Sequence, residues 1–146
     1  MTALDLSPLS ESRRLSFYGA LFAMSAADRD MDESEDDRIF ESLDLGGLSG
    51  DARKEVFRLA IQPPPLERCL LELRGESLEI RRGLMLNLID VVLADGIIEP
   101  GEHVGLHEAR EVLGLDRDDV ANLHDYAYKI QDQDVVRPVA PEPQAA

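Results

Sequence analysis

Residues 84–96 read Leu-Met-Leu-Asn-Leu-Ile-Asp-Val-Val-Leu-Ala-Asp-Gly, an almost wholly apolar stretch that runs into an acidic turn. The stretch has no strict alternation of apolar and polar residues, which an exposed strand would show, and it leaves little polar face. A helix that is apolar nearly all round belongs in the middle of a domain. We therefore expect an all-α protein built around a central helix at this position.

Helical spacing of apolar residues recurs on both sides of this stretch and predicts a single-domain bundle of about seven helices, with no convincing strand. The expected helix ends carry capping and breaking residues. Gly46-Gly47 stops the second helix, which is marked by Ile39, Phe40 and Leu43; Ser49 begins the third, Pro65 the fourth, Pro100 the sixth and Asp116 the seventh, and Gly114 ends the sixth.

The chain also contains an internal duplication. Shifting the sequence by 67 positions places residues 14–60 over residues 81–127, with ten identities in 47 pairs and no gap. Glycines, caps and apolar faces recur in phase, so that Ala27-Asp28 aligns with Ala94-Asp95 and Ser49 with Asp116. We interpret each copy as a unit of three helices, and the fourth helix joins the two units.

The length of 146 residues suits one domain, which we expect at residues 9–131 after a leader of residues 1–8. Residues 132–146 contain a Pro-rich run and are predicted to form a disordered tail. Cys69 is the single cysteine, so an internal disulfide is excluded, which fits a reducing cytosol. Its apolar neighbours predict a buried, inert thiol.

The composition is strongly acidic, with 30 Asp and Glu against 15 Lys and Arg and a net charge of −15. Such a surface repels phosphate backbones and anionic lipids, and it favours cations or basic partners. No apolar run approaches the roughly 20 residues of a membrane span. The N-terminus lacks the basic start and apolar stretch of a signal peptide. We expect a soluble cytoplasmic protein that binds no nucleic acid and does not insert into membranes.

Both copies of the duplication contain an Ala-Asp pair followed by further acids, at the point where a long apolar helix gives way to a short acidic one. Capping explains the later acids of each copy, because Asp32 with Glu35 has the spacing of a capping box and Glu99-Pro100 with Glu102 is a weaker version. It does not explain the first acid of each copy, which stands near a helix C-terminus, where the helix dipole disfavours a carboxylate. The six candidate metal ligands are Asp28, Asp32, Glu35, Asp95, Glu99 and Glu102.

Two kinds of counter-charge would suit these carboxylates, and the sequence leaves both open. A hard divalent cation such as Ca²⁺ takes carboxylate and carbonyl oxygens, which a turn between two helices presents. Arginine is the other candidate, because Arg29, Arg81 and Arg82 are available. An EF-hand is excluded, since its sixth position should be glycine and is Glu33, and its twelfth should be glutamate and is Ile39.

These same residues resemble the tellurite-resistance TerB family. The resemblance is carried by residues 94–102, by Leu113-Gly114-Leu115 and by the parallel segment from Ala27 to Glu35, and it covers roughly residues 14–131. It implies a small bacterial, cytosolic, all-helical bundle with a pseudo-duplicated core, linked to tellurite resistance and chemical stress. It also implies a divalent metal, a protein partner at the inner membrane face and no established catalysis. Arg29 departs from the family pattern, which often has glycine there.

Other patterns do not support an enzyme. His103 and His107 have the spacing of a zinc pair, but no third ligand is evident and two solvated histidines are the better interpretation. There is no Gly-x-Ser-x-Gly elbow, phosphate-binding loop or dinucleotide fingerprint. We therefore expect a monomeric, non-catalytic, metal-binding stress protein. The alternative is an acidic interaction module that docks a basic partner and binds no metal.

Overall fold

The computed structural model describes residues 6, 8–26, 48–93 and 100–130, and these residues form helices and connecting turns without a strand. The helices are α1 (Glu11–Ser25), α3 (Gly50–Ile61), α4 (Leu66–Leu73), α5 (Leu78–Leu93), α6 (Pro100–Leu113) and α7 (Arg117–Ile130). The all-α prediction is confirmed. The short helix expected around residues 39–43, the leader before residue 6 and the Pro-rich tail lie outside the described residues.

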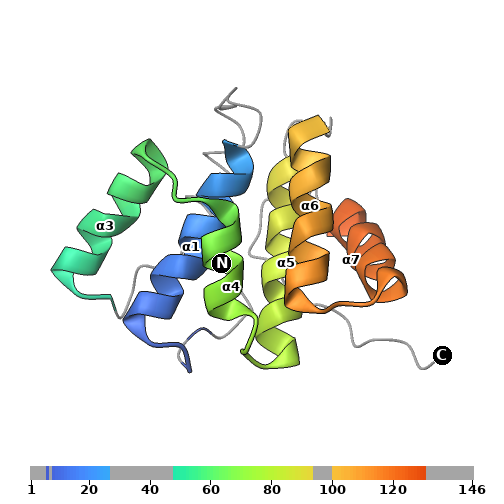
Figure 1. The fold of residues 1–146 in the computed structure, drawn as a ribbon, viewed down its shortest axis with the longest axis horizontal. Helices are drawn as coiled ribbons and strands as arrows, with labels where there is room; N and C mark the ends of the chain where they lie inside the picture. Colours follow the sequence, from blue (N-terminus) through green and yellow to red (C-terminus); the bar gives the residue numbers. More distant parts are fainter. Residues whose placement is uncertain (1–5, 7, 27–47, 94–99, 131–146) are drawn as a thin grey trace.

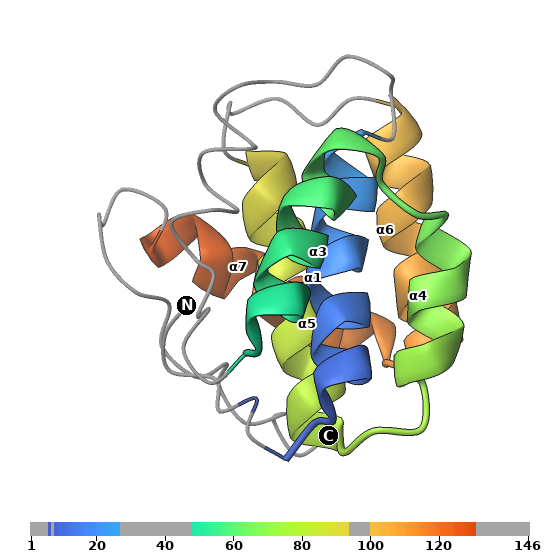
Figure 2. The same cartoon turned by 90° about the vertical axis from the view of Figure 1, so that its left-hand side faces the viewer.

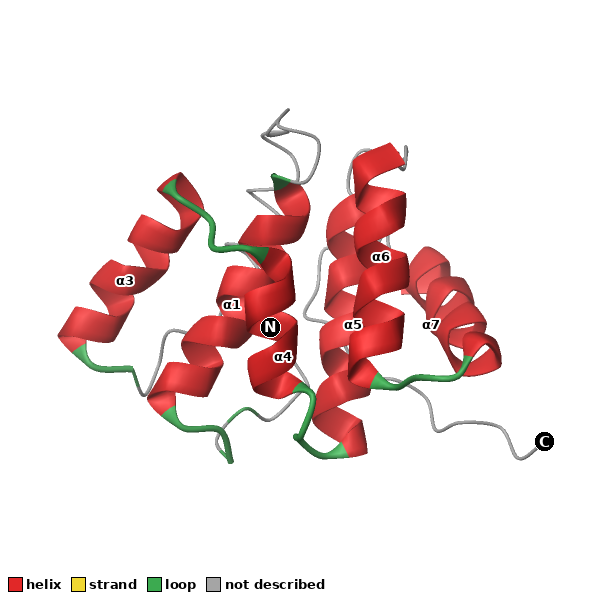
Figure 3. Ribbon diagram, viewed as in Figure 1, coloured by secondary structure: helices red, strands yellow, loops and turns green. Residues whose placement is uncertain are grey.

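The helices α1 and α5 occupy the centre of the molecule, and α4 and α6 lie against them (Figure 1). The two remaining helices flank this group, with α3 packed on α1 at one side and α7 packed on α5 at the other. The view turned by 90° shows α3 lying over α1, with α7 on the far side of α5 (Figure 2). Short turns join α3 to α4, α4 to α5 and α6 to α7 (Figure 3).

The prediction of a central apolar helix is confirmed in α5. Every residue from Arg82 to Leu93 is buried, including the polar ones. This helix packs against α1, α6 and α7, so it has no solvent-facing side over most of its length. The helix α1 is similarly enclosed, because all its residues from Phe17 to Ser25 are buried.

The helix boundaries reproduce the duplication found in the sequence. Adding 67 to the first residue of α1, Glu11, gives Leu78, the first residue of α5. The same shift takes Gly50, the start of α3, to Arg117, the start of α7. The packing matches as well, because α1 contacts α3 as α5 contacts α7. The two copies are therefore alike in the parts that the structure describes, and α4 connects them.

The predicted caps begin the helices as expected. The side chain of Ser49 accepts a hydrogen bond from the Ala52 N–H at 3.1 Å, and Pro65 directly precedes α4. The carboxylate of Glu11 also accepts the Ser49 N–H at 2.7 Å, which ties the start of α1 to the start of α3. This hydrogen bond lowers the pKa of the Glu11 carboxyl group.

Gly114 ends α6 in the left-handed conformation, with φ of 67°. The Leu115 N–H donates to the Arg110 carbonyl at 3.1 Å, and the Gly114 N–H donates to the Glu111 carbonyl at 3.2 Å. This is the pattern of a glycine C-cap, in which a side chain at the left-handed position would be strained. The guanidinium of Arg81 completes the cap by donating to the Leu113 carbonyl at 2.8 Å.

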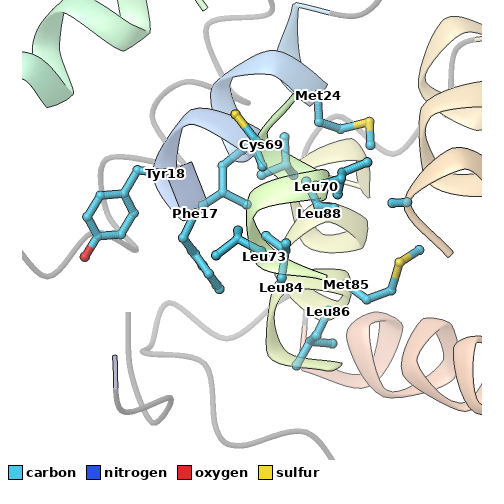
Figure 4. Packing of buried hydrophobic residues seen from close by; sticks show 14 of the residues in the cluster. Phe17, Tyr18, Met24, Cys69, Leu70, Leu73, Leu84, Met85, Leu86 and Leu88 are labelled. Atoms are coloured by element: carbon cyan, nitrogen blue, oxygen red, sulfur yellow. The ribbon is translucent and has the colours of Figure 1, made fainter. Parts of the chain in front are cut away.

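The core is continuous across the two copies and consists of apolar side chains from all the described helices. Phe17 of α1, Leu70 and Leu73 of α4, and Leu84 and Leu88 of α5 meet in its middle (Figure 4). Each of these five side chains is completely buried. Cys69 also belongs to this core, which confirms the prediction of a buried free thiol.

One buried ion pair holds α7 to the bundle. Arg82 of α5 and Asp119 of α7 form three hydrogen bonds of 2.9, 3.1 and 3.2 Å, and their side chains are 5% and 9% exposed. In a bidentate arginine–carboxylate pair of this kind, the parallel hydrogen bonds fix the relative orientation of the two side chains in addition to pairing their charges. Among the described helices α7 packs chiefly on α5, and this pair adds to the apolar contacts of Val120, Leu123 and Ala127.

Candidate functional site

The predicted metal ligands lie on the two segments that follow α1 and α5. Of the six residues, Glu102 in the first turn of α6 is within the described part of the chain. The other five, Asp28, Asp32, Glu35, Asp95 and Glu99, lie outside the described residues. The structure therefore describes the surroundings of the expected site and the position of one of its six residues.

The helix ends from which both acidic segments depart lie at the same end of the bundle. The last turns of α1 and α5 and the first turn of α6 all lie at the upper end in both views (Figures 1 and 2). The segment containing Asp28 follows α1 directly in the sequence, and the segment containing Asp95 and Glu99 connects α5 to α6. The two acidic motifs therefore leave the described fold from one end and not from opposite ends.

Glu102 is 2% exposed, which is unusual for a carboxylate. It belongs to the stripe of α6 that faces the core, together with Leu106, Ala109 and Leu113. A carboxylate at such a depth costs free energy unless donors or a cation compensate its charge. The free N–H groups of the first turn of α6 are one source of compensation, and a bound cation is another.

Asp90 is a second buried carboxylate at this end, and the sequence analysis did not select it. It is 3% exposed and lies one turn before the end of α5. One turn below it, the Asn87 side-chain amide donates to the Gly83 carbonyl at 2.7 Å. A usable signal was present in the sequence, because Asn87 and Asp90 are the only polar residues between Leu84 and Leu93 and are spaced to share one helix face.

Two of the arginines considered as counter-charges are committed elsewhere, so that part of the ion-pair interpretation is wrong. Arg82 pairs with Asp119, and Arg81 donates to the carbonyl groups of Glu76 and Leu113. Both arginines lie in the first half of α5, and about 16 Å of helix separates Arg82 from Leu93. They cannot neutralise carboxylates beyond the other end of that helix. The third candidate, Arg29, lies outside the described residues.

The three histidines of the chain lie on α6 and α7. His103 and His107 are both exposed on α6, as predicted, and the His107 Nε2 lies 2.5 Å from the Glu111 Oε1. His124 of α7 is half-buried, and burial lowers the pKa of its imidazole. Within the described ranges, no group of three or more His, Cys, Asp or Glu side chains is arranged to hold a metal ion.

A small cavity of about 190 Å³ lies between α1, α3 and α4. Its lining includes the potential nucleophiles Ser12, Ser16 and Cys69, but no histidine that could activate them. The hydroxyl of Ser16 donates to the carboxylate of Glu72, and burial raises the pKa of the Cys69 thiol to about 11. Among the described residues, the lining of this cavity shows no nucleophile paired with a histidine.

The structure thus defines a small all-helical domain with a duplicated helix arrangement and buried carboxylates at one end. A model of the family described as tellurite resistance protein TerB matches residues 14–125, which is more than half of the chain. The chain belongs to the TerB family. Neither the curated proteins nor the solved structures contain a match. None of the described helices combines the length and apolar character needed to cross a bilayer.

Proposed function

We propose that this protein is a non-catalytic member of the tellurite-resistance TerB family that binds a divalent cation at the upper end of its bundle. The expected ligands are the carboxylates of the two acidic segments, and Ca²⁺ is the expected ion because the donors are all oxygens. The ion would offset the repulsion among these carboxylates. We place this activity in the cytoplasm and in the response to chemical stress, with a protein partner at the inner membrane face.

The observation that carries this proposal is the position of Glu102. A glutamate that only capped α6 could do so from the surface, since capping-box glutamates ordinarily reach back along the helix rim. Here the carboxylate lies on the core-facing stripe, at the same end of the molecule as the helix ends that lead into both acidic motifs. Asp90 adds a second buried carboxylate at this end of α5. The two buried acids lie at the end of the bundle from which both acidic segments depart, and this concentration of carboxylates supports a cation there.

The net charge of −15 supports a second candidate, an acidic module that docks a basic protein and binds no metal. The two functions differ in how they depend on individual residues. Metal binding requires particular carboxylates, whereas docking through a charged surface responds to the total charge and weakens broadly as salt increases.

Calorimetric titration of the chelator-stripped protein with Ca²⁺, Mg²⁺, Mn²⁺ and Zn²⁺ tests the proposal. We expect saturable binding of Ca²⁺ that is lost in Asp28→Asn, Asp95→Asn or Glu102→Gln. Each substitution removes one charge and keeps nearly the same shape. Binding should also stabilise the fold, by about 2.7 kcal/mol at a free ion concentration of 100 Kd.

Asp125→Asn is the matched control, because it removes the same charge from an exposed position on α7. Circular dichroism of every variant checks that the helices remain. Equal loss of binding in Asp125→Asn would indicate diffuse charge effects and would support the docking module. No heat with any of the four ions, at unchanged helicity, would refute metal binding and leave the acids as caps.

A further inference from the structure

The outer face of α3 combines exposed apolar and basic side chains. Phe57 is 55% exposed and Ile61 is 81% exposed, and their spacing of one turn puts them on the same side of the helix. Lys54 lies three residues before Phe57, and Arg58 lies four residues after Lys54, so both cations border the apolar pair. Lys54, Phe57, Arg58 and Ile61 are called the α3 face below.

Among the described helices, the attachment of α3 does not use this face. The helix α3 attaches to α1 through its opposite side, where Ala52 and Val56 are buried in the core. Ile61, the most exposed large apolar side chain in the described part of the chain, sits on the last turn and projects away from that contact. Exposed apolar residues next to one another need an explanation beyond the usual scatter of single ones.

The second copy of the duplication provides an internal comparison. The positions of α7 that correspond to the four residues of the α3 face hold Ala121, His124, Asp125 and Tyr128. The corresponding face of α7 therefore has neither the basic residues nor the exposed phenylalanine, although the helix occupies the equivalent place in the fold. The composition of the α3 face is specific to the first copy and is not a consequence of the architecture.

The helix α3 has a net charge of +1, which is opposite in sign to that of the whole chain. Its charged side chains are Arg53, Lys54 and Arg58 against Asp51 and Glu55. Arg58 has a carboxylate neighbour, the Glu55 Oε2 at 3.5 Å, but exposed pairs of this type contribute little and exchange readily for another anion. The Debye length is about 8 Å at physiological ionic strength, so a short ligand on α3 senses these nearby cations more than the distant acids. A broad anionic surface such as a membrane would instead also face the remaining negative charge.

We infer that the α3 face docks a short acidic protein segment with apolar residues, which fit against Phe57 and Ile61 while its carboxylates pair with Lys54 and Arg58. The chemistry is that of an amphipathic acidic helix laid along a basic, apolar helix face. This interaction is independent of metal binding, because it uses α3 and none of the acidic residues discussed above. It gives the protein a docking surface whose charge is opposite in sign to that of the whole chain.

Fluorescence anisotropy with the full chain tests this inference. The probe is a fluorescein-labelled peptide of about 15 residues, with leucines at helical spacing and glutamates elsewhere. We expect saturable binding that weakens about tenfold in Ile61→Ser and is lost in the double variant Lys54→Glu/Arg58→Glu. Increasing salt should weaken the binding, and replacing the leucines of the peptide by serine should abolish it.

Val104→Ser is the matched control, because Val104 is an exposed apolar residue on α6, outside the α3 face. It should leave the peptide affinity unchanged, and thermal unfolding should show that every variant remains folded. Three results would overturn the inference. The peptide would show no saturable binding, or Val104→Ser would weaken peptide binding as much as Ile61→Ser does. In the third, vesicles of anionic lipid would displace the peptide by binding the protein through Ile61. Self-association of the chain that disappears in Ile61→Ser would also overturn it, since a second copy would then occupy the face.

Discussion

The ion pair between Arg82 and Asp119 predicts a large effect from a single substitution. Asp119→Ala removes a carboxylate that accepts three hydrogen bonds and leaves the guanidinium of Arg82 buried without its partner. Breaking a buried pair in this way costs about 3–5 kcal/mol, because the remaining charge keeps its desolvation penalty. The free energy of unfolding of an ordinary domain is about 5–15 kcal/mol. We therefore expect a severely destabilised but measurable variant.

Urea denaturation followed by circular dichroism provides the measurement. With a slope of about 2 kcal/mol per molar urea, a loss of about 4 kcal/mol lowers the midpoint by about 2 M. The duplication provides the companion variant. The first copy has Leu15 and Ala52 where the second has Arg82 and Asp119. The double variant Arg82→Leu/Asp119→Ala therefore places the apolar residues of the first copy at the equivalent positions of the second.

The double variant should recover part of the lost stability, because it leaves no buried charge without its partner. A loss below about 1 kcal/mol in Asp119→Ala, as measured for surface pairs, would refute the argument that the pair is buried and strong. A double variant as unstable as the single one would show that the damage comes from lost packing and not from the unpaired charge.

Three further predictions concern other parts of the fold. Gly114→Ala should destabilise the protein by about 1 kcal/mol, because φ of 67° strains any residue with a side chain. Gly75→Ala should not, because its backbone has no positive φ and an added Cβ meets open space. Equal midpoints of the two variants in thermal unfolding would contradict this. Cys69 should react with a thiol reagent at least about 100-fold more slowly in the native protein than in urea, because burial encloses the thiol and raises its pKa to about 11; similar rates would show that the thiol is accessible. Burial lowers the pKa of His124 below the 6.5 of an unfolded chain, so the unfolded state binds more protons and the free energy of unfolding decreases as the pH falls through 6.5. This decrease should be smaller in His124→Gln. Identical pH profiles of the urea midpoint in the two proteins would refute the prediction.

The local features of the fold could be predicted because single residues determine them. Ser49, Pro65 and Gly114 mark helix ends through their own hydrogen-bonding groups or backbone preferences, and the structure confirms each of them. The central position of α5 followed from its lack of a polar face. The duplication could be recognised because caps and apolar positions recur at a constant separation in the sequence.

Contacts between distant residues could not be predicted in the same way. Arg82 and Asp119 are 37 residues apart, and their pairing depends on how α7 packs on α5. Arg81 and Arg82 were among the candidate counter-charges of the acidic turns, because charge alone does not show which other side chains an arginine meets in the folded protein. Asp90 was overlooked for a related reason, since a polar residue in an apolar helix has no visible partner until the neighbouring helices are placed.

Glu102 shows where sequence pattern and function are hardest to separate. As the third residue of a helix that begins at Pro100, it satisfies the capping pattern, and its place in the acidic motif satisfies the metal pattern equally well. Its burial is the reason for the ligand role proposed above, because a cap needs only the edge of the helix whereas a ligand must point to the place that the ion occupies. The position on the core-facing stripe was readable in advance, since Leu106, Ala109 and Leu113 continue it at helical spacing. A charged residue on an apolar stripe departs from the rule that otherwise determines this fold, and such departures are expected at functional sites.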